Sequence, residues 1–308
     1  MDAHYALLED DALLHISGPD TLQFLQGQTT CDTRQVSPEQ AVAGAYCTPQ
    51  GRMVCDLLLA PLAEDHFGLR MRASLRPIAA AALAKYIVFS KAELDAERDD
   101  WRVLACWGAD AAQILAGLAG EVPGTQLGVV SGQGIRLVQI DDHGEQFEAW
   151  IDTAHHADHL DALGEALQQG DVETWHTLQV AAGRARLEAT TSEMFLPQDL
   201  NYDRTGLVSF DKGCYTGQEI VARLHYRGKP KRRTVPATID SNEAFAPGAP
   251  LFANGREQSV GNLVNRAPGV SLVCAALGAM DAPLALGSPD GPAVRCQASP
   301  YPLDDEAD

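Results

Sequence analysis

The chain of 308 residues is 45% hydrophobic and 21% charged, which is typical of a soluble globular protein with two or three domains. Its formal net charge of −19 disfavours nucleic-acid binding by the surface as a whole. Seven scattered cysteines without a CxxC pair disfavour a disulfide framework, a zinc site and a stable iron–sulfur cluster, so we expect reduced thiols.

The N-terminal residues MDAH contain neither a basic n-region nor an apolar h-region, so we expect no secretory signal. The apolar run over residues 270–280 is too short to cross a bilayer. These features predict a cytoplasmic protein that does not associate with a membrane.

The first part of the chain alternates apolar stretches with turn and helix signals, which predicts mixed α and β structure. Residues 17–20 (SGPD) resemble a helix start with proline in the first turn, and Gly27 is placed to end that helix. Residues 48–51 (TPQG) are typical of a turn. The expected strands are residues 12–16, 41–46, 53–60, 67–72, 101–107, 135–140 and 147–151. The other expected helices are residues 75–85, 109–118, 160–168 and 173–182.

His155 and His159 are four residues apart, a spacing that places two metal ligands on one face of a helix. No third ligand follows in a nearby motif, and Asp152 and Asp158 are typical helix-start residues. We favour a solvated helix end and expect no metal site.

Residues 212–219, KGCYTGQE, contain the strongest chemical signal in the chain. Apolar alternation over residues 207–210 predicts a strand before them, and the apolar spacing over residues 220–224 predicts a helix after them. Thr216 and Glu219 have the spacing of a capping box. The octapeptide is therefore expected to join a strand to a helix.

Cys214 is then expected just before the helix N-terminus, with Lys212 two residues upstream. Both features favour the thiolate over the thiol. Gly213 and Gly217 keep side-chain bulk away from the sulfur and permit positive φ. The alternative interpretation is a small buried cysteine in a tight strand–helix turn.

A run of cations without any acid follows the octapeptide, between Arg223 and Arg233. Its members are Arg223, Arg227, Lys229, Lys231, Arg232 and Arg233. This basic segment is either a solvated loop or a docking site for an anionic ligand, such as a polyglutamyl tail or an RNA phosphate.

From residue 234 short apolar stretches alternate with turns, which predicts a small antiparallel barrel or sandwich. Asn254-Gly255 is a strong hairpin signal, and residues 304–308 form an acidic tail that we expect to be disordered. The expected strands are residues 235–239, 251–253, 260–264, 272–277, 284–286 and 294–296.

The octapeptide, together with residues 195–198 (FLPQ), Asn201, residues 221–223 (VAR) and residues 227–228 (RG), resembles the signature of the YgfZ family of folate-binding proteins. That family is related to the aminomethyltransferase, or T-protein, of the glycine cleavage system. The resemblance implies an α+β fold. A GcvT-like folate-binding module of two subdomains over residues 1–233 would precede a small C-terminal antiparallel β-barrel over residues 234–303 and the tail over residues 304–308.

The resemblance also implies a tetrahydrofolate-binding protein that supports the assembly or repair of iron–sulfur clusters and thereby tRNA modification. Cys214 would be the reactive group, with Lys212 beside it. It could carry a one-carbon unit, guard a cluster or form a mixed disulfide. Glu188 matches the carboxylate that holds the pterin in the family. From their position in the sequence, on and just after the expected helix, we also expect Arg223 and Arg227 to reach the carboxylates of the ligand. Tyr215 and Gln218 are the other candidate folate-binding residues. The implied partners are folate, iron–sulfur client proteins and, through the basic segment, tRNA.

Two other functions stay open, and with them the question of enzymatic activity. One is a folate-dependent aminomethyltransferase, a one-carbon transferase. The T-protein has paired aspartates of which the first is held to be catalytic, but the matching positions here are Cys55 and Asp56. A thiol cannot orient and polarise the aminomethyl nitrogen as a carboxylate does. The other is a non-enzymatic adaptor that docks RNA through the basic segment.

Overall fold

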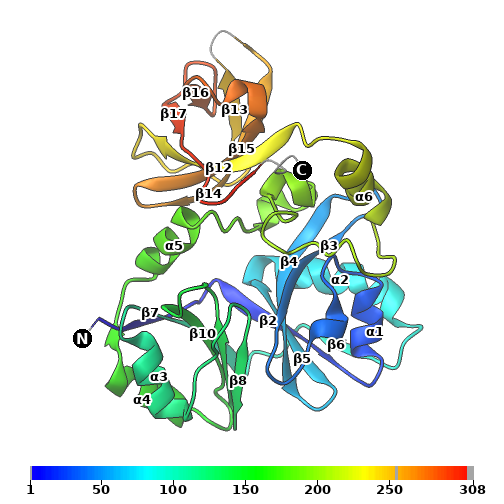
Figure 1. Ribbon diagram of the computed structural model, residues 1–308, viewed down its shortest axis with the longest axis vertical. Coiled ribbons are helices and arrows are strands. Elements are labelled where there is room, and N and C mark those ends of the chain that lie inside the picture. The colour runs from blue at the N-terminus through cyan, green and yellow to red at the C-terminus, as the bar shows by residue number, and fades with distance from the viewer. Residues whose placement is uncertain (1, 254–255, 304–308) are drawn as a thin grey trace. The chain divides into compact units, whose positions relative to one another are not determined.

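The computed structural model describes residues 2–253 and 256–303, and the chain forms two compact units (Figure 1). The first unit comprises Met1–Gly44 and Leu57–Trp175, and the second comprises Ala45–Asp56 and His176–Asp308. Both units are therefore discontinuous along the chain, unlike the contiguous domains expected over residues 1–233 and 234–303. That sequence-based division stays a prediction.

The first unit contains two β-sheets. One has six strands in the order β11-β1-β7-β10-β9-β8, and the other has five in the order β3-β4-β5-β2-β6, with β3 and β4 extending into the second unit. The strands are β1 His4–Leu7, β2 Asp11–Ser17, β3 Val42–Cys47, β4 Met53–Ala63, β5 His66–Arg72, β6 Glu93–Asp95, β7 Trp101–Trp107, β8 Val129–Gly132, β9 Ile135–Gln139, β10 Gln146–Asp152 and β11 Gln168–Gln169. All seven strands expected over this part of the chain are confirmed.

Helices cover these sheets with their apolar faces. The helices are α1 Thr21–Gln26, α2 Arg76–Ile87, α3 Ala111–Ala119 and α4 Asp158–Ala166, and α5 Val172–Ala181 follows. Leu115 of α3 and Leu163 of α4 pack into the same core as Phe147 of β10. Helix α1 ends at Gly27 as expected, but Pro19 lies before its first turn because the N-cap is Asp20.

A buried ion pair links the two sheets inside the first unit. Arg70 of β5 donates from Nε to Oε2 of Glu148 at 3.0 Å, and Glu148 also accepts from Nε1 of Trp150. A buried carboxylate is stable when its charge is paired and its oxygens are hydrogen-bonded. Glu148 meets both conditions.

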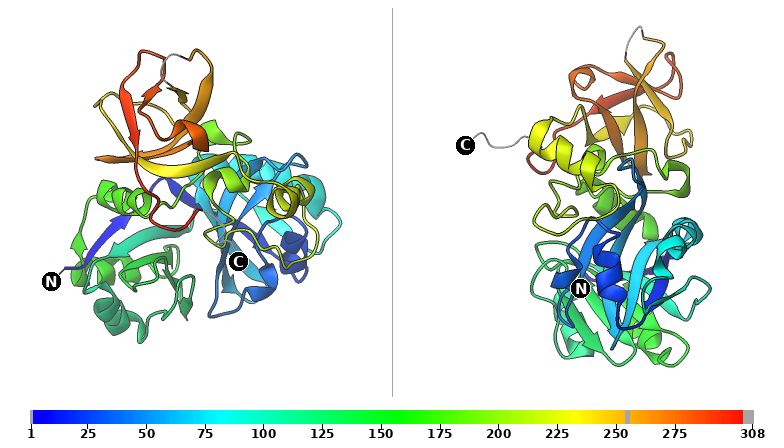
Figure 2. Two further views of the ribbon diagram at one scale, coloured as in Figure 1. Left: turned by 45° about the horizontal axis from the view of Figure 1, so that its top comes forward. Right: turned by 90° about the vertical axis from the view of Figure 1, so that its right-hand side faces the viewer.

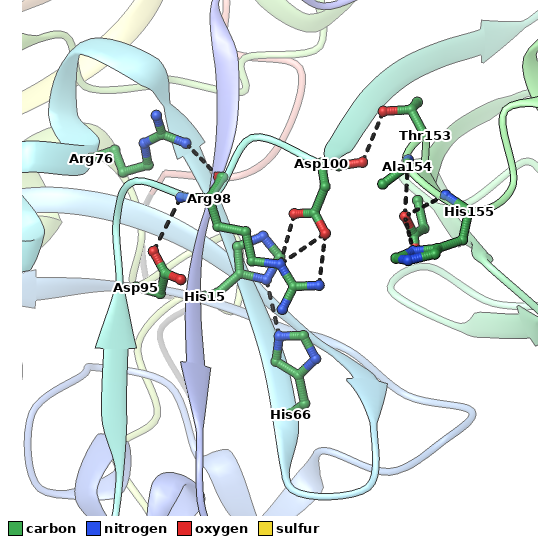
Figure 3. A network of polar contacts seen from close by, with 10 residues as sticks. His15, His66, Arg76, Asp95, Arg98, Asp100, Thr153, Ala154 and His155 are labelled. Carbon is green, nitrogen blue, oxygen red and sulfur yellow. Dashed lines mark hydrogen bonds and ion pairs between the residues drawn. The ribbon is translucent and has the colours of Figure 1, made fainter.

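A second polar network surrounds two histidines of the five-stranded sheet (Figure 3). Nδ1 of His15 lies 3.0 Å from Nε2 of His66, and Arg98 is paired with Asp100 close by. Burial lowers the pKa of His15 to about 4 and also lowers the pKa of His66. Both rings are therefore neutral at neutral pH, with one nitrogen of the pair donating and the other accepting.

The second unit contains a closed six-stranded barrel in the order β12-β15-β14-β13-β16-β17, in which every pairing is antiparallel (Figure 2). Its strands are β12 Arg232–Ile239, β13 Pro250–Ala253, β14 Ser259–Ala267, β15 Val270–Ala276, β16 Leu284–Leu286 and β17 Ala293–Cys296. The six strands expected from the alternating pattern are confirmed. The hairpin expected at Asn254-Gly255 and the tail over residues 304–308 lie outside the described residues. Closure pairs every barrel strand on both sides.

One α-helix of the second unit follows the octapeptide, α6 Gln218–Arg227. Single turns of 3-10 helix at Ala189–Thr191 and Pro197–Leu200 lie in the preceding segment. Asn201 ends the latter in a left-handed conformation and is completely buried. Its side-chain amide donates to the carbonyl of Thr234 at 2.6 Å and accepts from the Thr234 amide, so it pairs with β12 as a strand residue would.

Across the part of the chain that the structure describes, no helix combines the length and the apolar character needed to cross a bilayer.

Candidate functional site

The octapeptide is an irregular segment that ends in a helix. The strand expected over residues 207–210 is absent from this described segment, because the amides of Leu207 and Val208 both donate to the carbonyl of Tyr202 and close a local turn. Helix α6 begins at Gln218, and its N-cap is Gly217, whose φ of 87° places it in the left-handed region, in place of the expected N-cap Thr216.

Gly217 explains why the helix starts where it does. A Cβ on Gly217 would lie 2.5 Å from the carbonyl oxygen of Thr48 and 3.0 Å from Cβ of Cys47. The turn that joins β3 to β4 therefore packs directly against the backbone of the octapeptide. Gly51 of that turn also has positive φ and contacts Ile220 of α6. Only glycine fits the left-handed conformation at so close an approach.

Gly217→Ala is expected to lower the free energy of unfolding by at least about 2 kcal/mol, because alanine combines unfavourable φ with a clash against fixed backbone. Gly213→Ala is the matched control, since a Cβ at Gly213 would have open space within 4 Å, and it is expected to change stability by less than about 0.5 kcal/mol. Urea unfolding followed by circular dichroism measures both. Equal stability of the two variants would contradict this packing.

The predicted site residues of the octapeptide are found in different surroundings. Lys212 is buried, with 8% exposure, and its Nζ lies 5.2 Å from the centre of the Tyr215 ring. Tyr215 is also buried, and burial raises its pKa. Gln218 is half-buried and opens α6. Cys214 is exposed. The ammonium group of the buried Lys212 thus lies near an aromatic ring, whereas the Cys214 thiol is exposed.

All seven cysteines lie in the described part of the chain, and Cys214 alone is exposed. Burial raises the pKa of Cys55, Cys106 and Cys274 to about 12 and that of Cys296 to about 11, and it also raises the pKa of Cys47. A neutral buried thiol is a poor nucleophile. Cys214 is thus the cysteine that a solvent-borne reagent can reach, and the alternative of a buried cysteine is wrong.

A buried carboxylate lies on β4 next to Cys55. The side chain of Asp56 is 8% exposed, and its Oδ2 accepts from Nε of Arg186 at 3.4 Å. The Tyr202 hydroxyl lies 3.2 Å from the same oxygen and 3.0 Å from the carbonyl of Ala185, and burial raises the pKa of Tyr202. Oδ1 of Asp56 is buried and has no hydrogen-bond partner among the described residues. This oxygen is an acceptor that the described chain leaves open.

Glu188 follows Arg186 in an extended segment that the barrel holds in place. Asn265 of β14 accepts from the amide of Arg186 at 2.8 Å and donates to its carbonyl at 3.0 Å. The amide of Glu188 donates to Oγ1 of Thr191 at 2.9 Å, while the residue itself is half-buried. The segment is therefore fixed at Arg186 by β14 and by the Asp56 carboxylate, and Glu188 follows two residues later.

The basic segment divides into an exposed part and a structural part. Arg223, Arg227, Lys229 and Lys231 are exposed. Arg232 donates from Nη2 to Oδ1 of Asn262 at 2.8 Å, and Arg233 is buried against Asp203. Neither expectation for the basic segment, a solvated loop or a docking site, holds for Arg233, because its guanidinium group is bound inside the fold.

The paired histidines noted in the sequence have separate partners. His155 lies 3.0 Å from a carboxylate oxygen of Asp152, whereas His159 lies 2.8 Å from the carbonyl of Gln133. Within residues 2–253 and 256–303, no group of three or more His, Cys, Asp or Glu side chains is arranged to hold a metal ion.

Comparison with known proteins places this geometry in a family. Residues 12–142 match the family model of the GCVT N-terminal domain. The tRNA-modifying protein YgfZ of Klebsiella pneumoniae (strain 342) is 37% identical over 227 residues, which cover 73% of this chain and 68% of that protein. Its counterpart in Pectobacterium carotovorum (strain PC1) is 35% identical over 225 residues, which cover 73% of this chain and 67% of that protein. The chain belongs to the YgfZ family.

The fold of this YgfZ family member is also that of a glycine-cleavage protein. The crystal structure of the glycine cleavage system aminomethyltransferase T from Bartonella henselae aligns with a TM-score of 0.75 over 98% of this chain and 87% of that chain. At 19% identity, the alignment shows a shared fold alone. The predicted α+β fold with a GcvT-like module and a C-terminal antiparallel barrel is confirmed.

Sequence reasoning missed two residues of the candidate site. Asp56 stands out in the sequence only as the second of two positions matched to the T-protein, and nothing there points to Tyr202. Both lie outside any local motif, because Asp56 and Tyr202 meet only when β4 packs against the segment before the octapeptide. The one available signal was Asp56 itself, a carboxylate within a strongly apolar strand, since a buried charge requires partners.

Proposed function

We propose that this chain binds tetrahydrofolate or a derivative and supports tRNA modification by iron–sulfur enzymes. The observation that carries the proposal is the position of Cys214, the exposed thiol of the seven, on an octapeptide packed against the β3–β4 turn. The names of the curated relatives, tRNA-modifying proteins, support the role in tRNA modification. The family resemblance of the octapeptide and the acceptors of the second unit support the folate part.

The residues of the second unit fit a folate. A pterin ring presents an N–H and an exocyclic amine, which carboxylates accept well. Glu188 is half-buried and Asp56 has an open buried acceptor. In the proposal Glu188 holds the pterin, Tyr215 and Gln218 line the site, and Arg223 and Arg227 pair with the glutamate carboxylates of the ligand. Tetrahydrofolate supplies a carrier for a one-carbon unit.

Cys214 would act as a nucleophile or a redox thiol toward an iron–sulfur client protein. The thiolate is the reactive form of cysteine, and an exposed position gives access to a partner of any size. The surroundings of Cys55 also support a role outside aminomethyl transfer. Burial raises the pKa of Cys55 to about 12, so a neutral thiol stands where the T-protein has its first aspartate.

Glu188→Gln is expected to weaken tetrahydrofolate binding by roughly 10- to 100-fold, because an amide donor replaces one acceptor of a charged, bidentate hydrogen bond. Isothermal titration calorimetry on the full chain measures the dissociation constant. Glu243→Gln, at an exposed position of the same unit, is the matched control and is expected to keep the wild-type value.

An unchanged affinity in Glu188→Gln would mean that the pterin binds elsewhere, and Asp56→Asn would then identify the other carboxylate as its partner. The tRNA part is tested separately, in a bacterial strain that lacks its own YgfZ-family gene. Expression of this chain is expected to restore the iron–sulfur-dependent nucleoside modifications, measured by mass spectrometry of digested tRNA.

A further inference from the structure

Three aromatic rings gather on the surface of the second unit at the end of α6. The ring of Phe210 stacks on that of His225, with centroids 3.6 Å apart and planes 11° from parallel. Tyr226 stands nearly perpendicular to both rings, at centroid distances of 6.1 Å and 4.7 Å. We refer to Phe210, His225 and Tyr226 as the α6 ring cluster.

Stacking accounts for the positions of Phe210 and His225 but not for the exposure of Tyr226. Phe210 belongs to the irregular segment before the octapeptide, so its contact with His225 fastens that segment to α6. Tyr226 is 66% exposed, although Val221 on the buried side of the same helix is completely buried. A large aromatic side chain gains little stability from so exposed a position, whereas it offers a ring to a partner.

The charges around the α6 ring cluster are mainly positive. Arg223 and Arg227 lie one turn apart on α6, and Lys229 and Lys231 follow it, all of them exposed. The exposed acids on the adjoining segments are Asp211 and Glu219. In a chain with a net charge of −19, this concentration of cations favours an anionic partner, and the same net charge disfavours anions elsewhere.

The combination of exposed rings and cations selects one class of anion. Aromatic side chains stack on the π-face of a nucleobase, and cations hold the flanking phosphates. The base must be unstacked from its neighbours, which occurs in single strands and in the loops of folded RNA but not inside a duplex. A polyglutamyl tail or an acidic protein would use the cations and leave Tyr226 without a role.

We propose that the α6 ring cluster is a binding site for single-stranded RNA, with one unpaired base stacked on Tyr226 and adjacent phosphates on Lys229 and Lys231, while Arg223 and Arg227 serve the folate. The inference rests on the proposed role in tRNA modification and specifies which part of a tRNA the chain holds, namely a loop. RNA affinity would combine base stacking on Tyr226 with charge pairing to phosphates. Only the charge pairing depends strongly on the salt concentration, so the two contributions can be measured separately.

The test is fluorescence anisotropy with a labelled, unstructured 12-nucleotide oligouridine in 50–200 mM salt. Tyr226→Ala is expected to weaken binding by roughly 5- to 100-fold with the same dependence on salt, because it removes one stacked base. Tyr226→Phe keeps the ring and is expected to bind within twofold of wild type. Lys229→Ala is expected to reduce the slope of log affinity against log salt by about 0.7.

Two controls test whether the effect is specific to Tyr226 and to single-stranded RNA. Tyr86→Ala removes an exposed tyrosine of the first unit, 40% exposed, and is expected to leave RNA affinity unchanged. A 12-base-pair duplex is expected to bind equally to wild type and Tyr226→Ala. Circular dichroism and thermal unfolding of each variant verify that it is folded.

The inference is overturned if Tyr226→Ala binds the oligouridine as wild type does, or if no binding is detected at 50 mM salt. A different result would identify an acidic ligand instead. In that case Tyr226→Ala would keep the wild-type RNA affinity, and polyglutamate would compete with the oligouridine equally well in both proteins. Failure of the proposed function is a different result, in which the wild-type chain does not restore tRNA modification in the strain that lacks its own gene.

Discussion

Arg233→Ala is expected to lower the free energy of unfolding of the second unit by about 3–5 kcal/mol, the usual cost of breaking a buried ion pair from one side. Arg233 is 3% exposed, and its two terminal nitrogens donate to Oδ1 and Oδ2 of Asp203 at 2.6 Å and 3.0 Å. It also donates to the carbonyl of Gln198 at 2.9 Å. Alanine would leave the Asp203 carboxylate, itself 6% exposed, with the more distant Arg204 at 3.7 Å.

Urea denaturation followed by circular dichroism measures this effect, and Lys231→Ala provides the control. Lys231 lies two residues away in the same basic segment but is exposed, so its removal is expected to change stability by less than about 0.5 kcal/mol. The two variants are expected to reverse their order in RNA binding, where Lys231 contributes. Equal stability of the two variants would show that Asp203 does not depend on Arg233.

Cys214→Ala is expected to remove at least about nine tenths of the tRNA modification that the wild-type chain restores, and to leave its melting temperature unchanged within about 1 °C. The side chain is exposed, so alanine removes no buried contact and creates no cavity. Tetrahydrofolate affinity is expected to stay within twofold of wild type, because the folate-binding residues proposed above remain. Mass spectrometry of tRNA nucleosides and calorimetry give the two readouts.

Cys296→Ala is the control, since burial raises the pKa of Cys296 to about 11 and the residue is expected to be dispensable for modification. A thiol-reactive chromophore gives an independent check. The native protein should show one fast-reacting thiol, and Cys214→Ala should show none. If Cys214→Ala restored tRNA modification to the wild-type level, the proposed role of the thiol would be wrong, whatever the reactivity of Cys214.

Local patterns predicted the regular elements well and the connecting segments poorly. The strand Trp101–Trp107 and the six barrel strands were predicted because each contains an apolar stretch, and in the barrel these stretches are separated by turn signals. The strands β1, β6, β8 and β11 were not predicted from the sequence. These strands are recognised only by their hydrogen-bonded pairing with neighbouring strands. One example is β11, which pairs in parallel with β1.

The start of α6 shows the limit of local rules most directly. Thr216 and Glu219 have the spacing of a capping box, yet the helix begins after Gly217. The decisive contact is between Gly217 and the carbonyl of Thr48, a residue far away in the sequence. Similarly, Leu207 and Val208 look like strand residues but their amides bond to Tyr202. Tertiary contacts therefore override propensity at the octapeptide.

The candidate site could be predicted only in part, because tertiary contacts also decide which of its residues are buried. Cys214 was expected at a turn before a helix, with a reactive and a buried interpretation both left open, and the structure shows it exposed. The division of the basic segment was not, because Lys231 and Arg233 are equally cationic and nothing in the sequence separates them. Only the folded chain does so, by burying Arg233 of β12 against Asp203 and leaving Lys231 exposed.

The β3–β4 turn has a consequence for how the protein is made. Residues 45–56 belong to the second unit, but residues 57–175 leave the ribosome before the rest of that unit is synthesised. Until then Cys47, which is buried in the finished protein, lacks the octapeptide backbone at Gly217 that packs against it. The hairpin is thus open to solvent in nascent chains, and any contiguous fragment that contains the complete second unit also contains residues 57–175 of the first.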